Sequence, residues 1–371
     1  MASFIVEGVR IFTGEDVLEN ENALIENGII KYVGNDAPST VVRVVSGSGF
    51  TLIPDLIDAH IHADKGRVLV LEQSLRFGVT TVLNTHNELP NVAKSKKVAK
   101  EGKDVADFKS SCLAASVDQS WPAPIVTVHD KSEETMAEVA TWAKLAETKD
   151  VEMYMQQNIK DGADYIKMMH ESGKILGQNF NLLSTELQIV VVKATHGHGL
   201  IAVAHALTLE DTPTILESGL DGLTHTFSDT PPTRELIDAY KAQNTFCIPT
   251  LLVHGSVTGE GAPITASFAN DPRAVGKIAD AEKASMCECM HFGAQTCKVE
   301  NAYESPAPGT AWGISIHHEL YLFVQEAGST PQEAFRAGRK AHPVLIEGNP
   351  LENTCDTLNL KMVWRDGHKL Q

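Results

Sequence analysis

The pattern of hydrophobic and polar positions differs between the ends of the chain and its middle. Residues 1–54 carry short apolar runs broken by Gly, Asn and Asp, as in SFIVEGVRIFTG and NALIENGIIKYVG, which is typical of β-strands and turns. Residues 343–371 have the same texture, and KMVWRDGHKL predicts two strands joined by an Asp366-Gly367 hairpin turn. We therefore expect the two ends to form one small β-sandwich domain.

The middle of the chain, residues 55–342, alternates short apolar runs with helical patterns. Strands that alternate with helices favour a parallel sheet, and about eight such units in roughly 290 residues predict an α/β fold, a (β/α)8 TIM-like barrel that is either complete or short of its last unit. The expected strands are Leu52–His62, Thr80–Leu83, Ile125–Val128, Tyr165–Met169, Ile201–Ala204, Gly222–Thr224, Phe246–Val253 and a weak one at Thr296–Glu300. The expected helices include Glu133–Ala146, Thr185–Thr195, Thr233–Gln243 and Pro331–Ala337.

Composition narrows the classes of function. The 371 residues carry 31 Lys and Arg against 48 Asp and Glu, a net charge of −17 without any basic run, so we expect no nucleic-acid partner. The apolar runs fall short of the roughly 20 residues that span a bilayer, which predicts no membrane partner. The N-terminus lacks a signal-peptide pattern, and six scattered cysteines fit free thiols in a reducing compartment, so we expect a cytoplasmic protein.

Polar side chains collect where the expected barrel strands end. In DAHIH, the first strand ends with His60 and His62, and residues two apart on a strand point the same way. Three more strands supply Lys167 in GADYIKMM, His205 in LIAVAHAL and His225 in GLDGLTHTF. A single strand-end histidine is usually a core or loop residue, but functional side chains of such barrels project from the carboxyl ends of strands. The conjunction of these residues therefore predicts a metal site.

The chain resembles the metal-dependent amidohydrolase superfamily, and within it the imidazolonepropionase-like and prolidase-like branch. The segments that carry the resemblance are LIPDLIDAHIH, FGVTTV, GADYIKMM, HGHGLIAVAHA, GLDGLTHTF, GISIHHELYLFVQEAGSTPQEAFRA and VLIEGNPLEN. They cover nearly the whole chain. The resemblance implies a metal-loaded barrel with a small β-sandwich made from both termini, and dimers are common in this fold family, so a homo-oligomer stays open.

The resemblance also implies a role for each ligand. His60 and His62 would bind the more buried ion, and His205 and His225 the more exposed one. Lys167 would be carboxylated by CO2 and bridge the ions, because a carbamate is an anionic ligand whereas an ammonium is repelled. Zn2+, one or two ions per chain, is the expected metal for imidazole and oxygen ligands. Its bound water, with a pKa lowered toward about 7, would attack the carbonyl of a small-molecule substrate.

The chain departs from the family at the end of strand eight. Members carry an Asp there, in a Gly-Thr-Asp-like context, which binds metal and moves the proton to the leaving group. This chain has no Asp between Asp280 and Asp356. Glu300 or Glu304 could replace it, but one added methylene displaces the carboxylate by more than about 1 Å, which can cost on the order of 100-fold in rate. A second departure is AFRAGRKAHPVLIEG, which resembles two family segments fused.

Several other residues are candidates for contact with substrate. Glu300 is the expected proton carrier. His170 would sit at the barrel mouth, and His254 follows the expected seventh strand. We expect structural roles for His196 and His198, which lie at a helix end in THGHGL, and a positioning role for Asp58 beside a ligand imidazole.

Two hypotheses for function follow. The first is a metal-dependent hydrolase that cleaves an amide-type C–N bond, peptide-like, N-acyl or lactam, with metal-activated water. The second is a metal-binding protein of the same fold that has lost hydrolysis or catalyses cyclisation, isomerisation or decarboxylation of a small metabolite. The carboxylate near residue 300 separates them. A purely structural module is disfavoured, because five convergent ligands are costly to bury without a metal.

Overall fold

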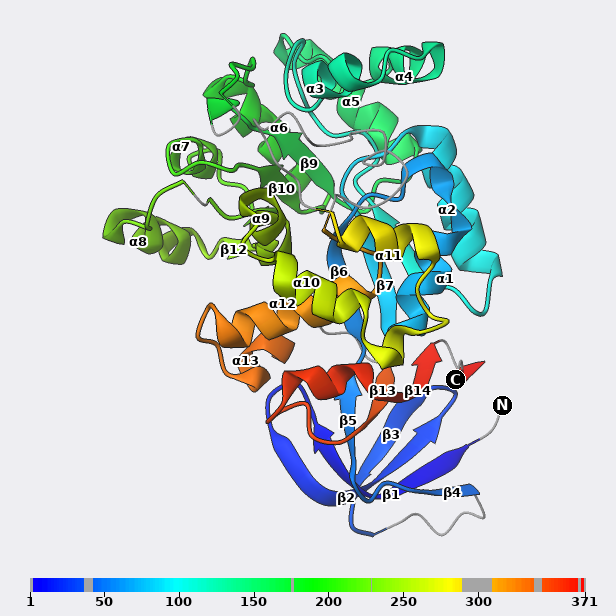
Figure 1. The fold of residues 1–371 in the computed structure, drawn as a ribbon. Coiled ribbons are helices and arrows are strands. Elements are labelled where there is room, and N and C mark those ends of the chain that lie inside the picture. Colours follow the sequence, from blue (N-terminus) through cyan, green and yellow to red (C-terminus); the bar gives the residue numbers. More distant parts are fainter. Residues whose placement is uncertain are drawn as a thin grey trace.

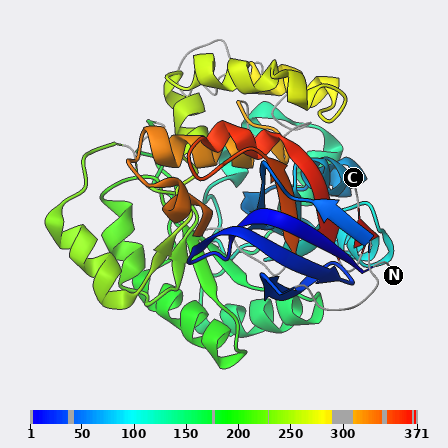
Figure 2. The same ribbon diagram turned by 90° about the horizontal axis from the view of Figure 1, so that it is seen from below.

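The computed structural model describes residues 3–36, 43–174, 177–227, 229–288, 309–336, 342–365 and 368–369. Both ends of the chain join in one eight-stranded sheet, which lies below the remaining elements in Figure 1 and is seen from beneath in Figure 2. Its strands are β1 (Phe4–Phe12), β2 (Val17–Glu26), β3 (Ile29–Gly34), β4 (Arg43–Ser46), β5 (Phe50–Pro54), β13 (Pro343–Glu347), β14 (Leu360–Arg365) and β15 (His368–Lys369).

Strand β5 joins the two ends of the chain. It runs parallel to β1 and antiparallel to β13, so that Leu52 is opposite both Ile11 and Leu345. All three side chains are buried, and they pack with Trp364 in the core of this sheet. The small β-sandwich domain expected from both termini, with its bounds at residues 54 and 343, stays a prediction.

Seven parallel strands follow one another in chain order above this sheet. They form two ladders, one of β6 (Leu56–Ile61), β7 (Val79–Asn84) and β8 (Asp107–Ser110), and one of β9 (Ile166–Met169), β10 (Ala202–His205), β11 (Gly222–Leu223) and β12 (Phe246–Cys247). An isolated parallel bridge between Ala115 and Met168 links the ladders. The described strands form an arc without closure. The expected eighth strand, Thr296–Glu300, lies outside the described residues.

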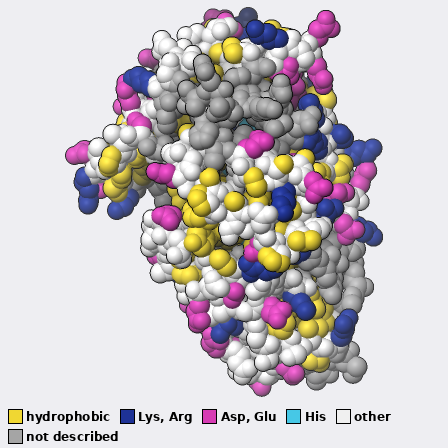
Figure 3. All heavy atoms as spheres, viewed as in Figure 1, with side chains coloured by type: hydrophobic (Ala, Val, Ile, Leu, Met, Phe, Trp, Pro, Cys, Tyr) yellow, Lys and Arg dark blue, Asp and Glu magenta, His cyan; other side chains and the backbone are white. Residues whose placement is uncertain are grey.

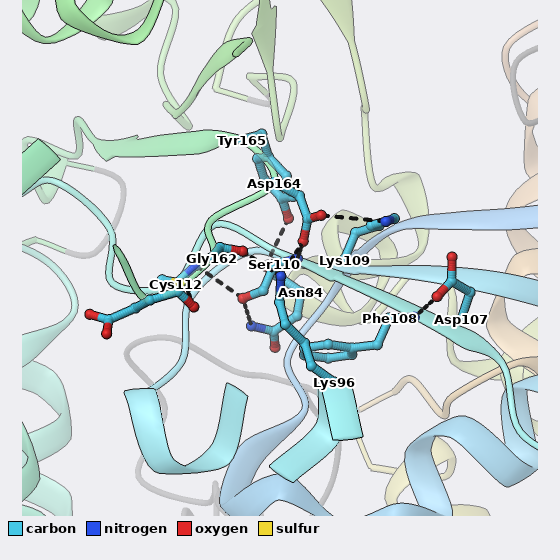
Figure 4. A network of polar contacts seen from close by, with 11 residues as sticks. Asn84, Lys96, Asp107, Phe108, Lys109, Ser110, Cys112, Gly162, Asp164 and Tyr165 are labelled. Carbon is cyan, nitrogen blue, oxygen red and sulfur yellow. Dashed lines mark hydrogen bonds and ion pairs between the residues drawn. The ribbon is translucent and has the colours of Figure 1, made fainter. Parts of the chain in front are cut away.

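A polar network fastens the two ladders at the junction of β8 and β9 (Figure 4). The Asp164 carboxylate accepts a hydrogen bond from the Ser110 backbone N–H (3.0 Å) and pairs with Lys96 Nζ (2.8 Å). Asn84, at the end of β7, donates to Ser110 Oγ (3.1 Å), and its carbonyl accepts from the Tyr165 hydroxyl (2.8 Å). These contacts tie β7, β8 and β9 side by side where the ladder hydrogen bonds are few.

Helices lie between the parallel strands and around them (Figure 1). They are α1 (Val68–Arg76), α2 (Leu89–Glu101), α3 (Ala123–His129), α4 (Glu133–Ala140), α5 (Thr148–Lys160), α6 (Thr185–Gly197), α7 (Asp211–Leu216), α8 (Arg234–Gln243), α9 (Leu251–Thr258), α10 (Ala262–Ala269), α11 (Asp280–Met286), α12 (Ile314–Gln325) and α13 (Pro331–Arg336). Apolar side chains gather over α10 on the face in Figure 3, while charges of both signs are spread around them. No helix in the described part of the chain has the length and apolar character needed to cross a membrane.

Two expected strands are wrong. Ile125–Val128 belongs to helix α3, which begins after Pro122 with Pro124 in its first turn, where proline is tolerated. The third strand is instead β8, a four-residue segment. Phe246–Val253 is a strand only to Cys247, because Thr250 has a left-handed backbone (φ 53°) and helix α9 begins at Leu251.

Candidate metal centre

The five predicted ligands line one cavity of about 490 Å³. Lys167 lies within β9, His205 ends β10, and His60 is the penultimate residue of β6. His62 and His225 follow the ends of β6 and β11 in irregular backbone. The strand-end positions identified in the sequence are therefore brought together by the curvature of the arc.

The imidazole rings approach one another across the arc. The ring centres of His60 and His225 are 4.5 Å apart, and those of His205 and His225 are also 4.5 Å apart. His60 and His62, two apart in sequence, have ring centres separated by 5.5 Å. The ring of His60, in β6, thus lies close to the ring of His225, which follows β11.

Hydrogen bonds fix the orientation of two rings. His60 Nδ1 lies 2.8 Å from the carbonyl oxygen of Thr224, which can only accept, so Nδ1 carries the proton and Nε2 keeps its lone pair. His225 Nδ1 lies 2.8 Å from Thr250 Oγ1. The Thr250 hydroxyl donates to the Pro249 carbonyl (2.7 Å), so it accepts from His225, which also leaves Nε2 as a ligand nitrogen.

A buried carboxylate and a tryptophan hold His205. Its Nε2 lies 3.4 Å from Glu171 Oε2, while Glu171 Oε1 accepts the Gly173 backbone N–H at 2.7 Å. Trp121 stacks on the ring with a centre separation of 5.8 Å. A carboxylate against one ring nitrogen orients the other toward a metal and raises its basicity.

Burial keeps the nitrogen donors neutral. Desolvation, helped by the charge of Lys167, lowers the pKa of His60 well below its usual value and that of His62 to about 3. Burial also lowers the pKa values of His205 and His225. The Lys167 side chain is 1% exposed, and burial lowers its pKa from 10.5 to about 7. Neutral imidazoles and a partly neutral amine therefore coexist at neutral pH.

The nitrogen donors of this site are of the kind that binds divalent ions, although they are not arranged as a complete coordination shell. Within the described residues, no group of three or more His, Cys, Asp or Glu side chains is arranged to hold an ion. Lys167 is not a ligand as an ammonium, and its charge lowers the pKa of each of the four histidines. The neutral, oriented imidazoles and the buried amine nonetheless fit the predicted ligand set.

The other predicted site residues have different outcomes. His254 lines the cavity, but from helix α9 rather than from a strand end, and its buried Nε2 has no partner among the described residues. His170 is absent from the described cavity lining, and its predicted role at the mouth stays a prediction. It is buried, with Nδ1 3.1 Å from Gln188 Nε2, and its backbone N–H donates to the His205 carbonyl (3.1 Å). Glu300 and Glu304 lie outside the described residues.

The remaining expectations concern residues near the site. Asp58 lines the cavity, and its Oδ1 accepts the backbone N–H of His60 (3.2 Å), not a ring N–H. Burial raises the pKa of Asp58 to about 6. His196 and His198 are exposed, and His196 pairs with Asp221 on the surface at 2.9 Å.

Sequence reasoning missed part of the cavity wall. Trp121 and Trp142 line it from loops, and Glu319 lines it from α12. The Glu319 carboxylate accepts the backbone N–H groups of Leu251 (2.7 Å) and Leu252 (2.8 Å), and burial raises its pKa to about 7. No local signal marks Glu319 as a cap for α9, since the contact joins residues 67 and 68 apart.

Comparison with known sequences gives short matches. No family model matches the chain. An adenine deaminase from Listeria welshimeri is 33% identical over 93 residues, and adenine deaminase 3 from Rhizobium meliloti is 32% identical over 90 residues. The first match covers 24% of this chain and 15% of the deaminase, and the second covers 23% and 15%. The matched region is therefore a small part of those longer proteins.

Comparison with solved structures covers the whole fold. A Xaa-Pro dipeptidase with bound methionine has a TM-score of 0.70 at 17% identity, and 99% of each chain is covered. Phenylurea hydrolase B has a TM-score of 0.73 at 16% identity, with 99% of this chain and 96% of that chain covered. Molinate hydrolase has a TM-score of 0.72 at 15% identity, with 99% and 94% covered.

These neighbours define a class of proteins by fold. The chain has the fold of amidohydrolase-superfamily hydrolases. Within that class its structural neighbours include prolidase-like enzymes, so the resemblance identified in the sequence is confirmed at the level of the fold.

Proposed function

We propose that this protein is a metal-dependent hydrolase that adds water across an amide-type C–N bond of a small molecule, giving an acid and an amine. The observation that carries the proposal is the meeting of four neutral histidines and a buried lysine in one cavity of an amidohydrolase fold. The neighbours include a dipeptidase and a phenylurea hydrolase, and the short sequence matches are to adenine deaminases. Reactions at C–N bonds are common to those names.

Zinc is our proposed metal, with one or two ions per chain. His60 and His62 would hold the inner ion, and His205 and His225 the outer one. A bound zinc ion lowers the pKa of its water toward about 7 and polarises a carbonyl oxygen. Lys167 would be carboxylated, and its lowered pKa supports this, because CO2 reacts with the neutral amine and not with the ammonium.

Other residues of the chain would prepare the site. The Thr224 carbonyl and the Thr250 hydroxyl hold two imidazoles in the tautomer that presents Nε2. Trp121 stacks on the buried ring of His205. His254 lines the cavity, and its buried Nε2, which has no partner among the described residues, would be available to bind substrate or hold a proton. Proton transfer by Glu300 stays a prediction.

Metal content and hydrolysis, measured on the same samples, test the proposal. We expect the purified protein to bind at least one equivalent of Zn2+ by mass spectrometry of the metal and to release amine from a panel of amides, carbamates and ureas. His60→Ala should lose both properties. His198→Ala is the matched control, since His198 is exposed and outside the cavity lining. A folded protein that binds no Zn2+ and hydrolyses nothing would contradict the proposal.

The absence of any Asp between Asp280 and Asp356 supports a second candidate. In this case the chain binds the metal but has lost hydrolysis or catalyses a non-hydrolytic step. Stoichiometric Zn2+ binding without amine release from any member of the panel would favour this candidate over the first.

A further inference from the structure

Helix α9 forms one wall of the cavity but has few buried side chains of its own. It runs from Leu251 to Thr258, and its buried residues are Leu252 and Ser256. Four of its side chains line the cavity, and that of His254 is among them. A helix of two turns is marginal without tertiary contacts, so the polar contacts at its start matter for the position of this wall.

The residue before α9 has an unusual backbone. Thr250 has φ 53° and ψ 48°, in the left-handed region that is unfavourable for a β-branched residue. Its carbonyl accepts the N–H of Val253 (3.0 Å), as expected at a helix start. Its side chain does not cap the helix. The N–H groups of Leu251 and Leu252, which have no partner within the helix, therefore need acceptors from elsewhere.

Glu319 supplies both acceptors from another helix. Its Oε1 accepts the N–H of Leu251 (2.7 Å), and its Oε2 accepts the N–H of Leu252 (2.8 Å). A carboxylate is also favoured at the positive end of the helix dipole. Helix α12, which carries Glu319, packs against α9 (Figure 1) and is itself fixed by a contact of 2.8 Å between His317 Nε2 and the Phe77 carbonyl. Glu319 thus fastens the first turn of α9 to α12.

Because Glu319 caps the helix, the side chain of Thr250 is available for another contact. Its hydroxyl donates to the Pro249 carbonyl (2.7 Å), and its Oγ1 lies 2.8 Å from Nδ1 of His225. A strained backbone persists only where the surrounding contacts impose it. The two hydrogen bonds from Glu319 act on the two residues that directly follow Thr250, so they restrain its left-handed backbone.

We infer that Glu319 is a positioning residue, which holds Thr250 in the backbone conformation that presents Oγ1 to Nδ1 of His225. The imidazole of His225 is thereby oriented with Nε2 as its ligand nitrogen. The inference rests on the proposed function for the role of that nitrogen, whereas the contacts themselves belong to the metal-free chain. Glutamine cannot replace Glu319, because it has one acceptor oxygen and its NH2 group would face the second backbone N–H.

The tautomer of His225 in the metal-free protein tests the inference without any reaction. Nuclear magnetic resonance of protein labelled with 15N-histidine reports which ring nitrogen carries the proton, and the signals of His225 are identified by their loss in His225→Ala. We expect the proton on Nδ1 in the wild type, and the loss of this preference in Glu319→Gln. A wild type with the proton on Nε2, or an unchanged tautomer in Glu319→Gln, would overturn the inference.

Glu326→Gln is the matched control. It removes the same charge at the residue that follows α12, which is exposed and outside the cavity lining, so the tautomer of His225 should stay as in the wild type. An equal change in both variants would show that loss of charge alone is responsible, and would overturn the inference. Should Glu319→Gln fail to fold, Glu319→Asp takes its place. It keeps the charge near α9, but its shorter side chain withdraws the carboxylate, so the same loss of the Nδ1 preference is expected.

A cycle of single and double variants separates positioning from general stabilisation. We expect Glu319→Gln and Thr250→Val each to weaken Zn2+ binding by about tenfold in a chelator competition. The double variant should be about as weak as either single variant, because both substitutions act through the same hydrogen bond to His225. Effects that multiply to about 100-fold would show that Glu319 acts independently of Thr250, and would overturn the inference.

These measurements can fail separately from the proposed function. Wild-type protein that binds Zn2+ and hydrolyses no member of the substrate panel would refute the proposed hydrolysis, while the tautomer and the variant cycle would still decide the role of Glu319. Wild-type protein that binds no Zn2+ would refute the metal centre, and the tautomer of His225 would then decide by itself whether Glu319 orients this imidazole.

Discussion

Replacing Lys167 by methionine should stabilise the metal-free protein against unfolding and abolish the proposed hydrolase activity. Lys167 lies in β9 between Ile166 and Met168, with 1% of its side chain exposed. No carboxylate is among the groups that shift its pKa, which burial lowers from 10.5 to about 7. Methionine has a similar length and no charge, so it fits the same space without the cost of desolvation.

The size and pH dependence of the effect follow from the pKa. The lysine pKa falls by about 3.5, and each pKa unit is worth about 1.4 kcal/mol, so protonated Lys167 destabilises the fold by up to about 5 kcal/mol. The folded pKa lies below the unfolded one. The unfolded chain therefore binds more protons between pH 7 and 10.5, and wild-type stability rises with pH across that window.

Urea unfolding measures this contribution. We expect Lys167→Met, after chelation and in bicarbonate-free buffer, to be about 2–5 kcal/mol more stable than wild type at pH 6.5 and only about 1–2 kcal/mol more stable at pH 9.5. The control is Lys160→Met, at an exposed position on α5, which should change stability by less than about 0.5 kcal/mol at both pH values. A destabilised Lys167→Met, or a gain that does not depend on pH, would refute the reasoning.

Three further predictions concern the supports of the site and the fold. Glu171→Gln should weaken Zn2+ binding by about 10–100-fold in a chelator competition while the thermal midpoint stays near that of wild type; unchanged affinity would show that Glu171 does not position His205. Thr250→Val leaves His225 Nδ1 without its acceptor and should cost about 1–3 kcal/mol in denaturant unfolding, and a neutral result would contradict the inferred tautomer. Leu52→Ala removes a fully buried side chain between β1 and β13 and should cost about 2–5 kcal/mol in urea unfolding; a loss below about 1 kcal/mol would mean that this contact does not hold the end sheet.

The sequence predicted best those strands that are apolar on both faces. The segments YIKMM and LIAVA became β9 and β10 within about one residue of their expected bounds, because interior parallel strands are hydrophobic runs. Strand β8 escaped notice, since DFKS is four residues long and its end at Ser110 is held by contacts with Asn84 and Asp164, which are distant in the sequence. The APIVTV segment is rich in β-branched residues and was assigned to a strand, but prolines at its start favour helix α3.

The candidate site shows the same contrast between positions that a local pattern predicts and positions that depend on tertiary contacts. Residues at the ends of strands could be predicted because the carboxyl ends of neighbouring parallel strands lie at the same edge of a sheet, and all five proposed ligands line the cavity. The contact of His170 with Gln188 of α6 is tertiary and leaves no local trace, and the role of His170 stays a prediction. Glu134 and Glu138, which line the cavity from α4, were missed because only the fold turns that helix toward the cavity.

Direct titration of the chelator-treated protein with Zn2+ tests the central claim. The account predicts binding of one or two equivalents that compete with a chromophoric chelator, the loss of this binding in His60→Ala and in His225→Ala, and its retention in His198→Ala. Absence of stoichiometric binding in the folded wild-type protein, or equal binding by all three variants, would contradict the claim that these side chains form a metal centre.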